Sequence, residues 1–252
     1  MIEVRSVTKR YGRTVVVDDV ELTLPAGGLV SIIGPNGAGK STLLSIVARL
    51  LPADAGSVLV DGHDVASTPG DVLARRLAVL RQENHLTVRL TVRDLVAFGR
   101  YPHSRGRLTT TDEAHVDAAL EHLGLTDLAG RFLDQLSGGQ RQRAHVAMVL
   151  AQDTEYVLLD EPLNNLDMKH ARQMMRMMRR AADELGRTVV VVLHDINFAA
   201  AYSDRVVAMR DGAVVVQGTP AQIMTPEALH AVYDMDIAVH DVAGAPLAAY
   251  YV

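Results

Sequence analysis

Short apolar runs alternate along the chain with longer segments in which apolar residues recur every three or four positions. Residues 20–24 alternate apolar and polar side chains, which is typical of a half-buried strand. The first 25 residues are therefore expected to form short strands, with a turn at Tyr11-Gly12-Arg13. Apolar runs predict further strands at 29–33, 58–60, 79–80, 156–159, 189–193 and 206–209. Because such strands alternate with helical patterns, the chain is predicted to be α/β with a mostly parallel sheet.

The helical segments divide into two groups. The first helix is expected to begin at Lys40, to place Leu43, Ile46, Val47 and Leu50 on one face, and to end at a proline, residue 52. Between about 83 and 150 the strand patterns stop and helical patterns dominate, with one helix opening at about residue 111. We therefore expect one domain over 1–252, with a nucleotide-binding core at 1–82 and 151–252 and an inserted helical subdomain at 83–150.

One segment matches the phosphate-binding pattern G-x-x-x-x-G-K-[ST]. Its residues, with the threonine that follows, are Gly34, Pro35, Asn36, Gly37, Ala38, Gly39, Lys40, Ser41 and Thr42. Glycines let consecutive backbone N–H groups converge on phosphates, and the helix N-terminus adds positive potential. Lys40 is expected to reach the β and γ oxygens, and Ser41 to supply a hard oxygen ligand to Mg²⁺. The strand before the motif and the helix after it strengthen the prediction of a nucleotide site.

Two carboxylates follow the apolar run at 156–159. Asp160 and Glu161 would lie at the C-terminal end of a parallel strand, beside the phosphate loop, where ligands of open α/β sheets bind. Asp160 is expected to hold Mg²⁺, and Glu161 to polarise the water that attacks the γ-phosphate.

Composition narrows the class of protein. The formal net charge of −5 argues against nucleic acid as the main partner, and the absence of cysteine excludes disulfides and thiolate-bound zinc. The chain has no stretch of about 20 apolar residues, so we expect that it does not cross a membrane. Met174, Met175, Met177 and Met178 form a helix face that we interpret as core packing.

Residues 136–143, Leu-Ser-Gly-Gly-Gln-Arg-Gln-Arg, resemble the signature motif of ABC (ATP-binding cassette) ATPases. Ser137, Gly138, Gly139 and Gln140 would form a second phosphate-binding loop at a helix start. The resemblance implies that this loop covers the γ-phosphate bound by the opposite subunit, in a two-fold symmetric dimer that encloses two ATP molecules.

The resemblance extends over the whole chain. It implies the ABC ATPase fold, which is a P-loop NTPase core with a mostly parallel sheet, an N-terminal antiparallel β subdomain and an inserted helical subdomain. It also implies further site residues. Tyr11 lies at the position of the aromatic residue that stacks on adenine, and Gln82 matches the glutamine that contacts Mg²⁺ and the attacking water. His194 matches the histidine that hydrogen-bonds the γ-phosphate. Asp167 lies in the loop that crosses to the other subunit, where residues 164–165, both asparagine, depart from the small Ser-Ala pair that is commoner in the family.

Three segments resemble the ATPases of ferric-siderophore importers in particular: 98–103, 163–170 and 194–204. The first is shared with haem and cobalamin importers, so those cargoes remain alternatives. The resemblance implies an ATPase on the cytoplasmic face of a membrane, paired with a second copy of itself, with permease subunits and indirectly with an extracytoplasmic binding protein. Residues from Gln82 to about 95 would receive a permease helix.

Three other classes of protein are alternatives to an importer ATPase. A soluble ABC protein of DNA repair or translation would carry a long coiled coil or two cassettes, which the spacing of the motifs does not accommodate. A GTPase or small-molecule kinase would need no signature motif. A non-catalytic module would not need Lys40, Glu161 and His194 together.

Overall fold

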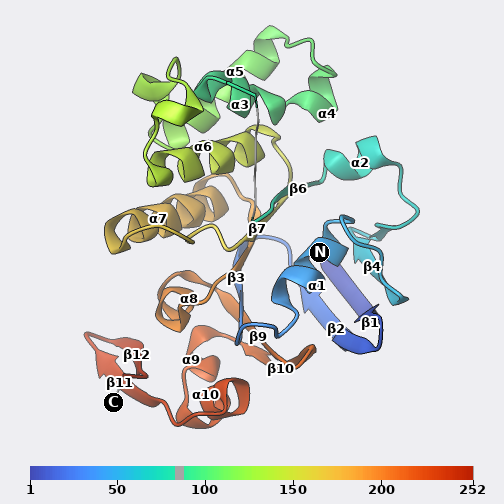
Figure 1. Cartoon of the computed structure of the whole chain (residues 1–252), viewed down its shortest axis with the longest axis vertical. Coiled ribbons are helices and arrows are strands. Elements are labelled where there is room, and N and C mark those ends of the chain that lie inside the picture. The colour runs from blue at the N-terminus through green and yellow to red at the C-terminus, as the bar shows by residue number, and fades with distance from the viewer. Residues whose placement is uncertain (83–87, 252) are drawn as a thin grey trace.

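A six-stranded sheet runs through the middle of the protein (Figure 1). The computed structural model describes residues 1–82 and 88–251. From edge to edge the strands are β10 (Ala213–Gly218), β9 (Arg205–Arg210), β3 (Gly28–Ile33), β8 (Thr188–Val192), β7 (Tyr156–Asp160) and β6 (Leu77–Leu80). All neighbours are parallel except β10, which pairs with β9 in antiparallel orientation. The predicted α/β class with a mostly parallel sheet is confirmed.

Both faces of this sheet are buried, which is why its strands are continuous apolar runs rather than alternating ones. In β3, Leu29 and Ile33 belong to one hydrophobic core, whereas Val30 and Ile32 belong to the other. The C-terminal ends of β3, β7 and β8 all lie at the same end of the parallel strands, and none of the three is an edge strand. The loops that follow them are therefore neighbours, although they lie far apart in the sequence.

A four-stranded antiparallel sheet covers one side of the core. Its strands, in order, are β2 (Thr14–Leu24), β1 (Ile2–Tyr11), β4 (Ala55–Val60) and β5 (His63–Asp64). The expectation of short N-terminal strands was wrong, because β1 and β2 have 10 and 11 residues. Polar residues interrupt their apolar pattern without ending them, since a strand with one solvent-facing side can be polar at every second position. Register shifts along the β1–β2 pair further obscure the alternation.

Helix α1 (Lys40–Val47) packs between the two sheets, and α2 (Gly70–Ala74) precedes β6. Leu43, Ile46 and Val47 are buried as predicted, but Leu50 is 47% exposed and lies beyond the end of α1. The helix ends early because Arg49 adopts a left-handed backbone conformation with φ of 55°.

A separate group of helices lies above the sheet in Figure 1. It contains α3 (Val92–Phe98), α4 (Tyr101–Ser104), α5 (Thr110–His122) and α6 (Gly138–Ala151), with short 3₁₀ turns at Thr126–Leu128 and Leu133–Gln135. Arg100 Nε donates to Asp112 Oδ1 at 2.9 Å, and both side chains are buried. Arg100 Nη1 also donates to the Ala151 carbonyl, so one guanidinium joins three helices. The subdomain limits at 83 and 150 remain a prediction, since 83–87 lie outside the described residues.

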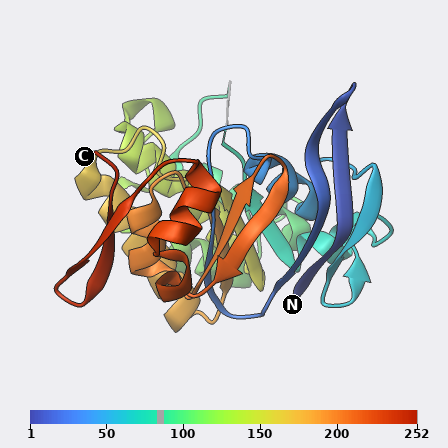
Figure 2. The ribbon, with the colours of Figure 1, turned by 90° about the horizontal axis from the view of Figure 1, so that it is seen from below.

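The C-terminal part contributes helices and a hairpin. Its elements are α7 (Met168–Glu184), α8 (Ile196–Tyr202), α9 (Pro220–Ile223), α10 (Pro226–Tyr233), β11 (Ala238–Val242) and β12 (Ala245–Ala249). The β11–β12 hairpin stands on the opposite side of the molecule from the blue N-terminal strands (Figure 2). The Asn197 side chain binds the backbone of Ala248 in both directions, at 2.8 and 3.2 Å, and thereby attaches the hairpin to α8.

Two smaller predictions concern single helices. Met174, Met175 and Met178 on α7 are buried in the core and Met177 packs against it partly buried, which confirms their interpretation as packing residues. Within residues 1–82 and 88–251, no helix combines the length and the apolar character that a membrane span requires.

Candidate functional site

The phosphate loop lies between β3 and α1, as the sequence predicted. Gly34 has a φ of 144°, and a Cβ there would lie 2.0 Å from the Met209 carbonyl oxygen on β9. A Cβ on Gly39, which has a φ of 93°, would lie 2.4 Å from the Val16 carbonyl oxygen. Only glycine fits either position without moving a neighbouring strand. These close contacts hold both ends of the loop against the sheets.

Lys40 folds back over this loop. Its Nζ donates to the carbonyl oxygens of Gly34 and Pro35, each at 2.9 Å, and the residue is buried. Burial lowers the pKa of the Lys40 ammonium below its ordinary value, while the negative charges of Glu161 and Asp160 act in the opposite direction. The positive charge is thus held at the centre of the loop, where a phosphate would bind.

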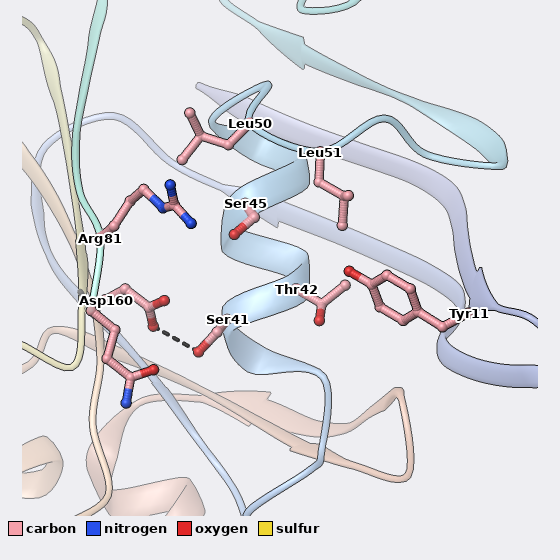
Figure 3. A pocket seen from close by; sticks show the side chains of 9 residues that line it. Tyr11, Ser41, Thr42, Ser45, Leu50, Leu51, Arg81 and Asp160 are labelled. Atoms are coloured by element: carbon pink, nitrogen blue, oxygen red, sulfur yellow. Dashed lines mark hydrogen bonds between the residues drawn. The ribbon is translucent and has the colours of Figure 1, made fainter. Parts of the chain in front are cut away.

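Asp160 ends β7 and faces the start of α1. Ser41 Oγ donates to Asp160 Oδ1 at 2.8 Å, as the dashed line in Figure 3 shows. Burial raises the pKa of the Asp160 carboxyl, against the smaller effect of the Ser41 hydrogen bond. A hydroxyl and a carboxylate at this separation are hard oxygen donors, which is the donor type that Mg²⁺ prefers. The predicted magnesium residues Ser41 and Asp160 therefore lie together.

Glu161 is the centre of a second cluster. Its Oε2 accepts hydrogen bonds from Gln82 Nε2 at 2.7 Å and from Asn164 Nδ2, and its Oε1 lies 2.8 Å from His194 Nε2. The Glu161 side chain is only 9% exposed. Its backbone φ of 50° is left-handed, which turns the side chain away from the direction that Asp160 takes. Three loops, after β6, β7 and β8, thus meet at one carboxylate.

Tyr11 belongs to a cavity that extends along α1. It is 54% exposed at the end of β1, and Figure 3 shows its ring beside Thr42, across α1 from Asp160. The cavity holds about 400 Å³, and its lining residues are Tyr11, Ser41, Thr42, Ser45, Leu50, Leu51, Arg81, Gln82 and Asp160. The motifs did not point to Ser45, Leu50, Leu51 or Arg81. The first three lie on α1 or just after it and Arg81 follows β6, so only the fold places them around one cavity.

The signature residues lie at the start of α6. Ser137 is the N-cap: its Oγ accepts from the Gln140 N–H at 3.3 Å, and Gln140 Oε1 accepts from the Ser137 N–H at 3.0 Å. Gly138 has open space around it, whereas a Cβ on Gly139 would lie 3.2 Å from the His170 ring.

The signature loop lies apart from the phosphate loop within one chain. Helix α6 belongs to the upper helical group and α1 to the lower part of Figure 1. Two cavities of the described residues are lined by residues of the phosphate loop, and neither is lined by residues 137–140. One chain does not bring its two predicted phosphate loops together.

Asp167 is placed at the N-cap of α7. Its Oδ1 accepts from the backbone N–H of His170 and contacts His170 Nδ1, both at 2.8 Å. The hydrogen bond from the His170 backbone is the main cause that lowers the pKa of Asp167. The side chain is 65% exposed and does not line the cavity around the phosphate loop. The contact of Asp167 with nucleotide remains a prediction, and the permease groove from Gln82 to 95 lies partly outside the described residues.

Comparisons with known proteins agree with this geometry. The family model for ABC transporters matches residues 17–164. The petrobactin import ATP-binding protein YclP of Bacillus subtilis is 47% identical, over 100% of both chains. The petrobactin import ATP-binding protein FatE of Bacillus anthracis is 50% identical, over 99% of this chain and 100% of that protein.

A solved structure extends the comparison to three dimensions. The dimeric structure of MJ0796, a bacterial ABC transporter cassette, aligns with a TM-score of 0.78 at 31% identity and covers 87% of this chain and 99% of that one. The family match, the identity along the whole length and the shared fold lead to one conclusion. This chain belongs to the ABC transporter family, as an ATP-binding subunit.

Proposed function

We propose that this chain hydrolyses ATP to drive the uptake of a ferric siderophore through a separate permease. The observation that carries the cargo assignment is the identity of 47% and 50%, along essentially the whole chain, to two ATP-binding proteins named for petrobactin import. Haem and cobalamin importers share only one of the three siderophore-like segments, so siderophore import has the stronger support.

The binding half of the proposed reaction rests on the loop before α1. Lys40 and the backbone N–H groups of residues 34–39 hold the phosphates, and Tyr11 stacks on the adenine across the cavity. Ser41 and Asp160, joined at 2.8 Å, would hold Mg²⁺, and Gln82 would complete its ligands. When bound, that ion neutralises charge on the β and γ phosphate oxygens.

The chemical half rests on the Glu161 cluster. The Glu161 carboxylate accepts a proton from the attacking water, and His194, already within 2.8 Å of it, orients the γ-phosphate. Lys40 and Glu161 line the same cavity as the phosphate loop, so the carboxylate lies beside the place where the γ-phosphate would bind. The reacting groups therefore come from three loops at one edge of the sheet.

The complete site needs a second copy of the chain. Ser137, Gly138, Gly139 and Gln140 cover the γ-phosphate of the partner, with Asp167 nearby. The separation of the two phosphate loops within one chain supports this arrangement, as does the dimeric form of the MJ0796 cassette. Closure of the dimer on ATP would move the permease subunits, and hydrolysis would release them. This places the chain on the cytoplasmic face of the membrane.

Uptake of labelled ferric siderophores by iron-starved cells tests the proposal. Cells carrying Glu161→Gln are expected to lose uptake of one siderophore class by roughly a hundredfold, because loss of a general base costs about 10²–10⁴ in rate. Ferric petrobactin is the first probe, followed by hydroxamate and catecholate chelates, with subunit levels checked by immunoblotting.

The matched control is Glu155→Gln, which neutralises an exposed carboxylate just before the same strand. This variant is expected to import at the wild-type rate. Normal uptake of every ferric chelate in the Glu161→Gln cells would refute siderophore import. Loss of haem or cobalamin uptake instead would reassign the cargo.

A further inference from the structure

Each oxygen of the Glu161 carboxylate has its own set of donors. Oε2 accepts from Gln82 Nε2 at 2.7 Å and from Asn164 Nδ2, whereas Oε1 lies 2.8 Å from His194 Nε2. A carboxylate oxygen offers about two acceptor sites. The two side-chain amides therefore fill Oε2, whereas Oε1 keeps acceptor capacity on the side of His194.

Asn164 reaches the carboxylate because the chain turns back on itself. The Asn164 N–H donates to the Glu161 carbonyl at 3.2 Å, which closes a tight turn directly after β7. Left-handed backbone at Glu161 and Asn165, with φ of 50° and 62°, shapes both ends of this turn. The amide of Asn164 consequently returns to the side chain three residues before it.

The contact between Asn164 and Glu161 depends on the side-chain amide of asparagine. The commoner Ser-Ala pair of this loop carries no amide at either position, so it has no NH₂ group to place against the carboxylate. In this chain the loop predicted to cross to the other subunit also touches the carboxylate of its own subunit.

We propose that Asn164 is a positioning residue for ATP hydrolysis: with Gln82 it occupies Oε2 and so leaves Oε1, on the His194 side, to take the proton from water. This inference rests on the proposed function of Glu161. In the step concerned, the water oxygen bonds to the γ-phosphorus as the bond to the bridging oxygen of ADP breaks, and the water proton passes to Oε1. Asn164 acts only through the carboxylate that it holds.

Steady-state ATPase kinetics of the purified full-length chain test the proposal. Asn164→Leu keeps the approximate shape of the side chain and removes its NH₂ group. We expect kcat to fall about ten- to a hundredfold, which is the cost of losing one hydrogen bond to a charged group, while the KM for MgATP changes less than about twofold. Adding Asn164→Leu to Glu161→Gln should lower kcat no further, since the amide then has no carboxylate to position.

Gln222→Leu is the control, because it removes an exposed amide that caps α9, and its kinetics should match the wild type. If Asn164→Leu loses its cooperative thermal transition, Asn164→Ala carries the same expectation. An unchanged or raised kcat, or a loss expressed mainly in KM, would overturn the positioning role while leaving the proposed function intact. An inactive wild type would instead refute the proposed function, and this inference with it.

Discussion

Asp160 and Glu161 are consecutive carboxylates with opposite surroundings. Asp160 is buried beside α1 with a single hydroxyl donor, and burial raises its pKa. Glu161 instead accepts from two side-chain amides and contacts His194, and these three residues come from loops after three different strands. The left-handed turn at Glu161 separates the two side chains, so neighbours in the sequence serve different parts of the site.

The burial of Asp160 predicts a conflict between stability and function. The pKa of Asp160 is higher in the folded than in the unfolded state, so the fold loses stability as pH rises from the unfolded to the folded pKa. At neutral pH the full loss of stability is present. Asp160→Asn removes the buried charge and keeps an acceptor for Ser41. We expect its melting temperature without nucleotide to rise by roughly 2–4 °C, the shift for about 1 kcal/mol in a domain of this size, and MgATP hydrolysis to be lost.

Differential scanning calorimetry measures the melting temperature of Asp160→Asn, and an ATPase assay measures its hydrolysis of MgATP. Glu155→Gln serves as the comparison. It neutralises an exposed carboxylate just before the same strand and should leave the melting temperature and the ATPase rate unchanged. A lower melting temperature for Asp160→Asn would show that the carboxylate stabilises the nucleotide-free fold.

The phosphate loop and the two carboxylates could be predicted because each depends on adjacent residues. A motif of consecutive residues before a helix, or an acid after an apolar run, needs only local structure. The contact between Asn164 and Glu161 could not be predicted, because it depends on a turn whose backbone conformation no periodicity reports. Arg81 was missed for a related reason: its place in the cavity follows from the packing of β6 beside α1.

At the scale of elements, the missed strands show what a sequence pattern needs. Strands β11 and β12 contain few β-branched residues and one proline, so their sequences do not predict strands. Strand β10 did have a signal, since Asp211-Gly212 is a favoured two-residue hairpin turn between apolar runs. The helix at Lys40, by contrast, was predicted from apolar residues at helical spacing, and the helix after Ser137 from the signature motif, and both are present as α1 and α6.

The start of α5 predicts a pH dependence. Hydrogen bonds from the Thr109 backbone and hydroxyl, and from Arg100, lower the pKa of Asp112 from 3.8 to about 2. A depressed folded-state pKa stabilises the fold above the unfolded value and ceases to do so as pH falls through the folded value. The difference in free energy of unfolding between wild type and Asp112→Asn should therefore be constant above about pH 4 and shrink between about pH 4 and 2.

Urea unfolding at a series of pH values measures this difference. Asp117→Asn, on the exposed face of the same helix, should differ from wild type by less than about 0.5 kcal/mol throughout, as expected of a surface ion pair. A wild-type advantage over Asp112→Asn that persists unchanged at pH 2 would contradict the assignment.

At the scale of the whole molecule, one chain holds two predicted phosphate loops, at the starts of α1 and α6, which lie in different parts of the molecule. The proposed site therefore joins the phosphate loop of one copy to the signature loop of another. Two variants that each lack one loop, Lys40→Ala and Ser137→Asp, should be inactive alone. Mixed together they form a dimer with one complete site and one doubly defective site, so ATPase activity should return to about a quarter of the wild-type level.

Mixing at a one-to-one ratio, with each variant assayed alone at the same total concentration, measures the recovery. No recovery on mixing, with both variants folded, would refute the shared site. A mixture of Lys40→Ala with Glu161→Gln is the comparison: both defects lie in the same half-site of each copy, so its activity should stay at background.

The cap of α6 has a consequence for how two copies meet. Ser137 Oγ uses a lone pair to accept from the Gln140 N–H, and this contact leaves the hydroxyl proton available for donation. The loop is ordered by its own helix before any partner arrives. Dimerisation in the presence of ATP would then require no further ordering of the signature loop. The loop loses its conformational entropy when the chain folds, and not when two copies associate.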